Sequence, residues 1–410
     1  MISTRCCVVG GGPAGMMLGL LLARAGVDVV VLEKHGDFLR DFRGDTIHPS
    51  TLEVLAELGL LERFLALPHQ EVAEFQAASG ERTVTFADFR HLPTRCRFVA
   101  FMAQWDFLAF LAGEARRFPA FTLRMETEAT GLVTDAGRVA GVRARSPDGD
   151  LEVRADLVVA CDGRNSGLRR DAGLPVKEIG APIDVLWFRL SRRPDDPEAT
   201  MGRFDVGRVV VLINRGGHWQ VGYVVPKDGA EALKERGLDA FRDDIAAVVP
   251  FLADRVPELA SWDDVPLLSV RVNRLTRWWA PGLLCIGDAA HAMSPVGGVG
   301  INLAIADAVA AANLLAGPLR SGRPGNADLA RVQRRREIPT RVTQGLQVLL
   351  QNQVLSPLLQ GRVEAGTPAG LRLLDRVPVL RRIPGRLVGL GVRPEHVVPE
   401  LRKGSYPGLR

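Results

Sequence analysis

The chain has 410 residues, of which 47% are hydrophobic and 24% are charged. This length exceeds what one hydrophobic core usually serves, so we expect two structural units, and the composition excludes a disordered or fibrous protein. The formal charge is +5 at pH 7, but acidic residues are scattered among the arginines along most of the chain. A nucleic-acid-binding protein would concentrate its basic residues on one stretch or face, so we expect no nucleic-acid partner.

The cysteines are odd in number and lack the paired spacing of a zinc site or a disulfide framework: Cys6, Cys7, Cys96, Cys161 and Cys285. Four of them fall in apolar, strand-like runs, where a buried thiol behaves as a small hydrophobe. We therefore predict a cytoplasmic protein.

The apolar run from Cys6 to Leu22 could be mistaken for a signal peptide or a membrane span. Gly10, Gly11, Gly12 and Pro13 interrupt it, and one inserted helix would tolerate them poorly. No uninterrupted apolar stretch of spanning length is expected elsewhere. The sequence thus predicts no transmembrane segment.

The N-terminal run reads instead as a strand over 5–9, a helix over 13–25 and a second strand over 27–32. The turn between the first strand and the helix carries Gly10-x-Gly12-x-x-Gly15, and Glu33 follows the second strand. Glycines let the backbone approach a pyrophosphate at the helix N-terminus, and the carboxylate can accept hydrogen bonds from ribose hydroxyls. An ordinary glycine-rich turn is the alternative, but the full order favours dinucleotide binding. The motif does not distinguish FAD from NAD(P).

Further elements follow in chain order. Helices are predicted from Pro49 and over 104–117, and strands separated by turns are predicted over 121–156. A buried strand over 157–160 then leads into Cys161-Asp162-Gly163. Strands return over 184–190, 208–213 and 219–225, followed by a helical stretch over 238–256.

These elements suggest a discontinuous nucleotide-binding domain made of residues 1–70, 98–172 and 269–345. The second, substrate-binding domain would consist of residues 71–97 and 173–268. Residues 346–410 contain arginines among leucines and prolines, and we interpret them as a C-terminal helical segment that packs on the body of the protein rather than on a membrane surface.

A second glycine-rich constellation lies between a strand over 283–287 and a helix over 301–315. The strand delivers Asp288 into a loop, where its carboxylate can bind sugar-alcohol hydroxyls. The helix N-terminus would face a group that becomes anionic, such as the edge of a reduced flavin. A structural strand-to-helix turn is the alternative, and it is disfavoured by a cluster of special residues: Gly287, Asp288, Pro295, Gly297, Gly298 and Gly300.

The sequence resembles the single-component FAD-dependent aromatic monooxygenases of the p-hydroxybenzoate hydroxylase type. That family combines an N-terminal GxGxxG, a mid-chain Asp-Gly motif, here Asp162-Gly163, and a late Gly-Asp motif, here Gly287-Asp288. All three occur in the family's order, over roughly residues 1–320. The resemblance implies an α/β fold: a Rossmann-like FAD-binding domain, an inserted β-sheet substrate domain and C-terminal helices.

The resemblance also implies which residues form the site. FAD would contact Gly10, Gly12, Pro13, Ala14, Gly15, Glu33, Lys34, Arg43, Gln104, Asp162, Gly287, Asp288, Pro295, Gly298, Val299, Gly300, Ile301 and Asn302. Arg164 and Arg169 would pair with phosphate. The catalytic candidates are His48, Arg43 and Pro295, and the substrate candidates are Trp187, Arg189, Trp219 and Tyr223. His48 and His291 could each act as a base or be hydrogen-bonded structural histidines, and the substrate candidates could equally be ordinary sheet residues.

The family's chemistry is that of its cofactor. NAD(P)H reduces FAD, O2 adds at flavin C4a, and the hydroperoxide hydroxylates a small aromatic or polycyclic molecule. No metal is needed. A flavin-dependent dehydrogenase or reductase, or a non-catalytic flavin-binding protein, remains an alternative. Halogenation is disfavoured because Trp278 and Trp279 are adjacent, unlike the Trp-x-Trp-x-Ile-Pro of flavin halogenases. The many arginines and few lysines hint at a GC-rich bacterial gene and natural-product biosynthesis.

Overall fold

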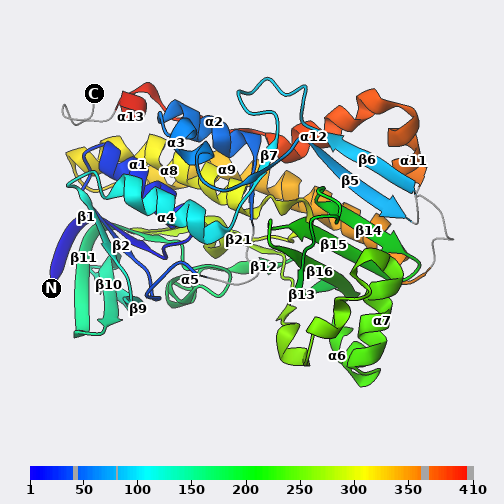
Figure 1. The fold of residues 1–410 in the computed structure, drawn as a ribbon. Helices are drawn as coiled ribbons and strands as arrows, with labels where there is room; N and C mark the ends of the chain where they lie inside the picture. Colours follow the sequence, from blue (N-terminus) through cyan, green and yellow to red (C-terminus); the bar gives the residue numbers. More distant parts are fainter. Residues whose placement is uncertain (40–44, 80–81, 362–368, 404–410) are drawn as a thin grey trace.

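The computed structural model of the protein describes residues 1–39, 45–79, 82–361 and 369–403. An eight-stranded sheet and a seven-stranded sheet occupy the two ends of the view in Figure 1, and long helices cover the first of them. Two three-stranded sheets complete the β-structure of the described residues. The fold is the expected α/β architecture.

The eight-stranded sheet has a parallel centre. In spatial order its main path is β19 (Trp279–Ala280), β20 (Leu283–Cys285), β11 (Gly149–Ala160), β1 (Ile2–Val9), β2 (Val29–Leu32) and β8 (Phe121–Arg124). β9 (Glu128–Asp135) and β10 (Arg138–Ser146) extend it antiparallel from β11. Because β1, β11 and β20 are parallel neighbours, their carboxyl ends meet at one edge. The three motifs that follow these strands therefore meet there too.

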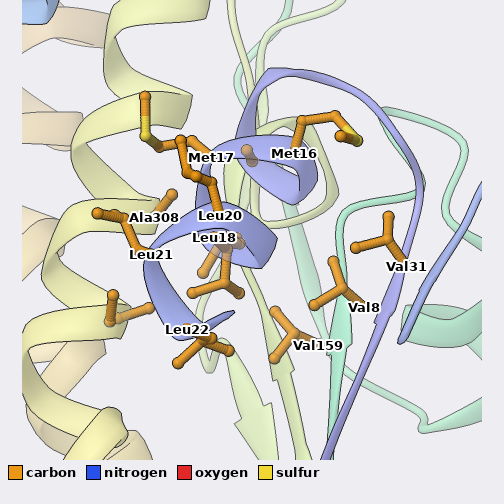
Figure 2. Close-up of a cluster of buried hydrophobic side chains, with 14 of the residues drawn as sticks. Val8, Met16, Met17, Leu18, Leu20, Leu21, Leu22, Val31, Val159 and Ala308 are labelled. Carbon is orange, nitrogen blue, oxygen red and sulfur yellow. The ribbon is translucent and has the colours of Figure 1, made fainter. Parts of the chain in front are cut away.

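Helices cover the parallel sheet: α1 (Pro13–Arg24), α4 (Gln104–Ala115), α8 (Gly300–Ser321) and α9 (Asn326–Leu350). Figure 2 shows the side chains of α1 between α8, marked by Ala308, and the sheet, marked by Val8, Val31 and Val159. Nearly all of α1 is buried, because it packs against sheet and helices at once. This arrangement explains why an apolar run with glycines is a core helix here.

One helical stretch, Val296–Ser321, is long and apolar enough to cross a membrane by length and composition alone. The sequence analysis expected no such stretch, and this helix leaves the expected absence of a transmembrane segment unconfirmed. Seventy-two per cent of its most apolar window is buried inside the protein, where α8 packs against α1 and α9. A helix enclosed in this way needs apolar residues on every side.

The seven-stranded sheet is mostly antiparallel. Its spatial order is β17 (Leu267–Leu268), β13 (Ile183–Ser191), β16 (His218–Pro226), β15 (Arg208–Asn214), β14 (Met201–Asp205), β5 (Glu74–Ser79) and β6 (Arg82–Asp88). β5 and β6 come from the segment before α4, so two distant parts of the chain build one sheet (Figure 1). α6 (Ala230–Glu235) and α7 (Leu238–Val248) pack on one face. α7 ends earlier than the predicted 256, since Pro250 follows it.

The other described elements join these two sheets or form the C-terminal part. The small sheets consist of β12 (Val176–Glu178), β18 (Asn273–Leu275) and β21 (His291–Ala292), and of β3 (Thr46–Ile47), β7 (Val99–Phe101) and β4 (Gln70–Val72). The remaining helices are α2 (Pro49–Glu57), α3 (Leu61–Leu65), α5 (Gly167–Asp171), α10 (Ser356–Leu359), α11 (Ala369–Arg376), α12 (Arg382–Gly389) and α13 (Pro399–Lys403). α11 and α12 contact β6.

Candidate active site

A cavity of about 810 Å³ lies where the carboxyl ends of the parallel strands approach the seven-stranded sheet. The residues around it come from all three sequence motifs. Many predicted FAD contacts line it: Gly10, Gly12, Pro13, Ala14, Glu33, Lys34, Gln104, Asp162, Asp288, Pro295, Gly298, Gly300 and Ile301. Gly15, Gly287, Val299 and Asn302 do not, and Arg43 lies outside the described residues.

The first helix start is shaped by backbone contacts. Gly10 has φ +108°, and a Cβ there would lie 2.3 Å from the carbonyl oxygen of Cys161. A Cβ on Gly15 would lie 1.9 Å from the carbonyl oxygen of Gly10. Gly12 differs, because a Cβ there would meet no atom within 4 Å. Gly10 and Gly15 therefore close the turn, while Gly12 leaves open space beside the N-terminus of α1.

Glu33 holds the same turn from the side. Its Oε2 accepts a hydrogen bond from the Gly11 amide at 2.8 Å, and its Oε1 accepts one from the His35 amide at 3.1 Å. The side chain also lines the cavity. The carboxylate thus orients the glycine turn in addition to facing the space where a ribose would lie.

The second helix start, at α8, is held by side chains. Gly298 has φ +64°, and a Cβ there would lie 2.3 Å from Oγ1 of Thr46. The Thr46 hydroxyl donates to the Gly298 carbonyl at 2.8 Å. Among the residues that the structure describes, no side chain caps α8, so its first N–H groups are available to a ligand. This N-terminus and Pro295 border the cavity.

Asn302 and His48 meet behind this helix start. Asn302 Oδ1 accepts hydrogen bonds from the His48 amide at 2.9 Å and the Thr51 hydroxyl at 2.7 Å. His48 is fully buried, and its Nδ1 lies 2.8 Å from the Val388 carbonyl oxygen. Burial lowers the pKa of His48 to about 4, although that hydrogen bond opposes the shift. Neither side chain lines the cavity, so both brace α2 against α8 rather than face a flavin.

The Asp-Gly segment contributes Asp162, which lines the cavity, and Arg169, which connects two loops beside it. Asp162 lines the cavity, and its Oδ1 has no hydrogen-bond partner within the described part of the chain. Burial raises its pKa, partly offset by hydrogen bonds from its neighbours. Arg169 is buried and donates to the Ala289 carbonyl at 3.2 Å and to the Arg164 carbonyl. It ties the Asp-Gly loop to the Gly-Asp loop instead of pairing with phosphate, which corrects the expectation. Arg164 does line the cavity.

The seven-stranded sheet gives the cavity an apolar wall made of Trp187, Ile213, Leu268 and Val270. Trp187 lies opposite Gly222 in the sheet, and a Cβ on Gly222 would lie 3.0 Å from its ring. The glycine therefore leaves room for the indole. Nε1 of Trp187 has no hydrogen-bond partner among residues that the structure describes.

The other three substrate candidates, Arg189, Trp219 and Tyr223, do not line the cavity. Arg189 is two residues from Trp187, on the same face of β13, but it is exposed and does not line the cavity. Trp219 and Tyr223 pair with Leu190 and Leu186 and pack in the core under α7. The Trp219 Nε1 donates to Asp196 at 2.8 Å. Of the two alternatives left open by the sequence, this placement favours core sheet residues over substrate contacts for Trp219 and Tyr223.

A polar group at the cavity edge was missed by the sequence analysis. Asp45 lines the cavity and forms a buried ion pair with Arg215, which follows β15. Nε of Arg215 donates to Gln220 at 3.0 Å. Burial raises the pKa of Asp45 to about 6, against the lowering effect of Arg215. Only three-dimensional proximity distinguishes these residues, since neither lies in a recognisable motif.

The residues around the cavity fit FAD. The open space at Gly12 and the N-terminus of α1 suit a pyrophosphate, and Glu33 and Asp288 offer carboxylates for sugar and ribityl hydroxyls. The uncapped N-terminus of α8 lies at the same cavity and suits the part of a flavin that becomes anionic. Among the described residues, no cluster of three or more His, Cys, Asp or Glu side chains could hold a metal ion.

Comparison with known proteins identifies the class. A family model described as an FAD binding domain matches residues 3–345. The chain therefore belongs to this family, and it is an FAD-dependent aromatic monooxygenase of the p-hydroxybenzoate hydroxylase type.

Among individual proteins, the chain is 37% identical over 387 residues to the 6-methylpretetramide 4-monooxygenase of Streptomyces rimosus, covering 94% of this chain and 92% of that relative. The p-nitrophenol 4-monooxygenase PnpA of Pseudomonas putida DLL-E4 superposes with a TM-score of 0.78 at 22% identity, covering 96% of this chain and 100% of that chain. The anhydrotetracycline hydroxylase OxyS of Streptomyces rimosus gives 0.74 at 22%, covering 96% and 77%. At this identity the two structures show the fold. The protein is thus an FAD-dependent monooxygenase that uses NAD(P)H as reductant.

Proposed function

We propose that this monooxygenase hydroxylates a polycyclic aromatic polyketide. The main support is the 37% identity, over nearly the whole chain, to a relative named for 6-methylpretetramide. The cavity is consistent with this substrate class, because Trp187, Ile213, Leu268 and Val270 form one broad apolar wall. Flat fused rings bury much apolar surface against such a wall.

The motifs would hold the two ends of one FAD molecule. The amides at the start of α1 would bind the pyrophosphate, Glu33 the ribose and Asp288 the ribityl chain. The isoalloxazine would lie beside Pro295 and the N-terminus of α8. Bound FAD supplies the activation of O2 and the transfer of one oxygen atom to the ring. These assignments agree with the residues that line the cavity.

The chain's own contribution is to place the substrate and to exclude water. Trp187 and Ile213 would contact the ring face, while the ion pair of Asp45 with Arg215 offers a polar edge for substrate oxygens. A dry cavity protects the oxidising flavin from unproductive decay. We further propose that the parallel sheet is the FAD-binding domain, that the seven-stranded sheet is the substrate domain, and that the protein is cytoplasmic.

The direct test uses the purified holoenzyme with NADPH, isotope-labelled O2 and a panel of fused-ring phenols and single-ring phenols. We expect substrate-stimulated NADPH oxidation and one labelled oxygen atom in the product, with higher kcat/KM for the fused rings. Oxidation without label would instead indicate the dehydrogenase alternative. Equal or better turnover of single-ring phenols would contradict the polyketide proposal.

Trp187 offers a test of the proposed substrate wall. Trp187→Ala should raise KM for a fused-ring substrate by roughly tenfold, because a large apolar contact is lost, with FAD content unchanged. Trp219→Phe is the matched control, since this indole lies under α7 and not at the cavity. It should lower thermal stability with little change in KM. If KM rose equally in both variants, the proposal that Trp187 contacts the substrate would be contradicted.

A further inference from the structure

Asp307 of α8 is a buried carboxylate that binds three donors. Its Oδ2 accepts hydrogen bonds from the Gly287 amide at 3.0 Å and lies 2.6 Å from His291 Nε2. Its Oδ1 accepts one from Arg336 Nε at 2.9 Å. The side chains of Asp307, His291 and Arg336 are each at most 2% exposed. Burial alone would raise the pKa of Asp307, but His291 and Arg336 lower it overall, so the carboxylate is held ionised.

This carboxylate holds the turn that delivers Asp288 to the cavity. Gly287 has φ +58°, and a Cβ there would lie 3.1 Å from Cβ of Ala14 at the start of α1. The Gly-Asp turn therefore packs closely on the first glycine turn. The next residue, Asp288, lines the cavity. Asp307 does not, so any effect of Asp307 on FAD must pass through the Gly287 amide and His291.

The same network continues into the C-terminal segment. Arg336 Nη1 donates to Glu395 Oε1 at 3.2 Å and to the Arg393 carbonyl at 3.3 Å. Glu395 is 4% exposed and also pairs with Arg335, whose Nε lies 2.8 Å from its Oε1. Glu395 follows the last residue matched by the FAD-binding family model, which is 345. A segment beyond that match is thus linked to the Gly287–Asp288 turn through Arg336 and Asp307.

We propose that Asp307 is a positioning residue for FAD, which fixes the Gly287–Asp288 turn through the Gly287 amide, and that Arg336 and Glu395 belong to the same support. Buried ion pairs contribute little net stability compared with apolar packing. Their hydrogen bonds are directional, however, and three of them here converge on the Asp307 carboxylate, which binds the amide of the turn. The proposal rests on FAD binding and is independent of the proposed substrate.

Asp307→Asn tests the first link. The amide keeps the shape of the side chain but loses the charge and places an NH2 group against donors. We expect the FAD dissociation constant to rise at least tenfold, as measured by titrating FAD into the apoprotein and following quenching of flavin fluorescence. The rise in melting temperature on adding FAD should shrink correspondingly. A purely structural role would lower the melting temperatures of apoprotein and holoprotein equally and leave that rise unchanged.

Asp156→Asn is the matched control. Asp156 also binds two arginines, Arg5 and Arg323, but it lies away from the cavity. This variant should retain the FAD affinity of the wild type. If it weakened FAD binding as much as Asp307→Asn does, the proposal would be overturned.

Glu395→Gln tests the second link, and if Asp307→Asn does not fold, an unchanged FAD affinity in Glu395→Gln overturns the whole proposal. Because Glu395 acts through Arg336, we expect a smaller rise in the FAD dissociation constant, about threefold. An FAD affinity within the error of the wild type, in a variant with unchanged circular dichroism, would overturn the role of the C-terminal segment. A folded Asp307→Asn with unchanged affinity would overturn the whole proposal. Neither result depends on finding a substrate.

Discussion

The starts of α1 and α8 face the same cavity, but the molecule positions them by different means. At α1, the glycine turn fits against backbone atoms, since Cβ atoms on Gly10 and Gly15 would strike carbonyl oxygens. At α8, side-chain hydrogen bonds connect the helix start to distant segments: the Thr46 hydroxyl donates to the Gly298 carbonyl, and the side chain of Asn302 in α8 accepts from the His48 amide. One glycine turn is thus shaped mainly by close backbone packing, and the other mainly by side-chain hydrogen bonds.

This difference has a physical consequence for specificity. A turn fixed by backbone contacts places its amides in nearly the same way in any chain with the same glycine spacing, which suits a pyrophosphate common to many cofactors. A helix start held by side chains can shift when those side chains change. We therefore expect changes in the glycine turn before α1 to abolish cofactor binding, and changes in the glycine loop before α8 to alter turnover while the cofactor remains bound.

Gly12→Val should have the largest effect. Gly12 has φ −73°, which valine accepts, and a Cβ there would meet only open space. The protein should fold, but the new side chain would occupy the space of the pyrophosphate. We expect FAD affinity to fall by roughly a hundredfold or more, as about 3 kcal/mol of lost phosphate hydrogen bonds implies. Flavin absorbance of the purified protein measures this.

Gly113→Val is the control, because Gly113 is an exposed position in α4 where a Cβ also meets nothing within 4 Å. It should keep its FAD. Normal flavin occupancy in folded Gly12→Val would contradict the placement of the pyrophosphate and would break the comparison between the two helix starts.

Gly298→Ala should have the next largest effect and sharpen the comparison. The added Cβ would lie 2.3 Å from Thr46 Oγ1 in a left-handed conformation, and this strain amounts to about 1–3 kcal/mol. We expect FAD to remain bound through α1 and kcat to fall roughly tenfold, because the flavin-side loop must move. Steady-state kinetics with matched FAD content measures the change.

Gly297→Ala separates strain from contact. Gly297 also has a positive φ of +79°, but the nearest atom to its Cβ would be Val299 Cγ1 at 3.8 Å. This control carries a similar conformational cost without the clash, so its kcat should fall less. If both variants lost FAD instead of turnover, α8 would not be the weaker of the two anchors.

The sequence predicts the α1 turn well because a short, recognisable motif encodes it. Gly15 packs on the Gly10 carbonyl within the turn, Gly10 packs on the Cys161 carbonyl at the end of the neighbouring parallel strand, and Glu33 lies at the end of the other adjacent parallel strand. The order of motifs also predicts that they converge, because β1, β11 and β20 are parallel neighbours. The α/β fold and the cavity-lining residues of these motifs were accordingly within reach of sequence analysis.

The remaining site residues depend on long-range packing. The side chain of Asn302 accepts a hydrogen bond from the His48 amide although the two residues are more than 250 positions apart. No rule of sequence spacing predicts this contact. Trp219 and Tyr223 are core residues because α7 covers the face of β16 on which they lie. The alternation of side chains along a strand does not by itself show which face a helix covers. The pairing of Asp45 with Arg215 also brings distant segments together. These positions required the structure.

His48 provides the smallest expected effect on turnover and tests the brace of α8. Its folded-state pKa of about 4 is below the ordinary 6.5, so the unfolded state takes up its proton first as the pH falls. The resulting stability is fully present above pH 6.5 and decreases as the pH falls toward 4, by about 2 kcal/mol between pH 7 and pH 5. Denaturant unfolding of the wild type and of His48→Gln should show this pH dependence only in the wild type.

Because Nε2 of His48 does not reach the cavity, kcat of His48→Gln should change less than about threefold, and the pH profile of kcat should stay unchanged. Loss of the acidic limb of that profile would instead make His48 a catalytic base and show that the starts of α2 and α8 are part of the chemistry rather than its support.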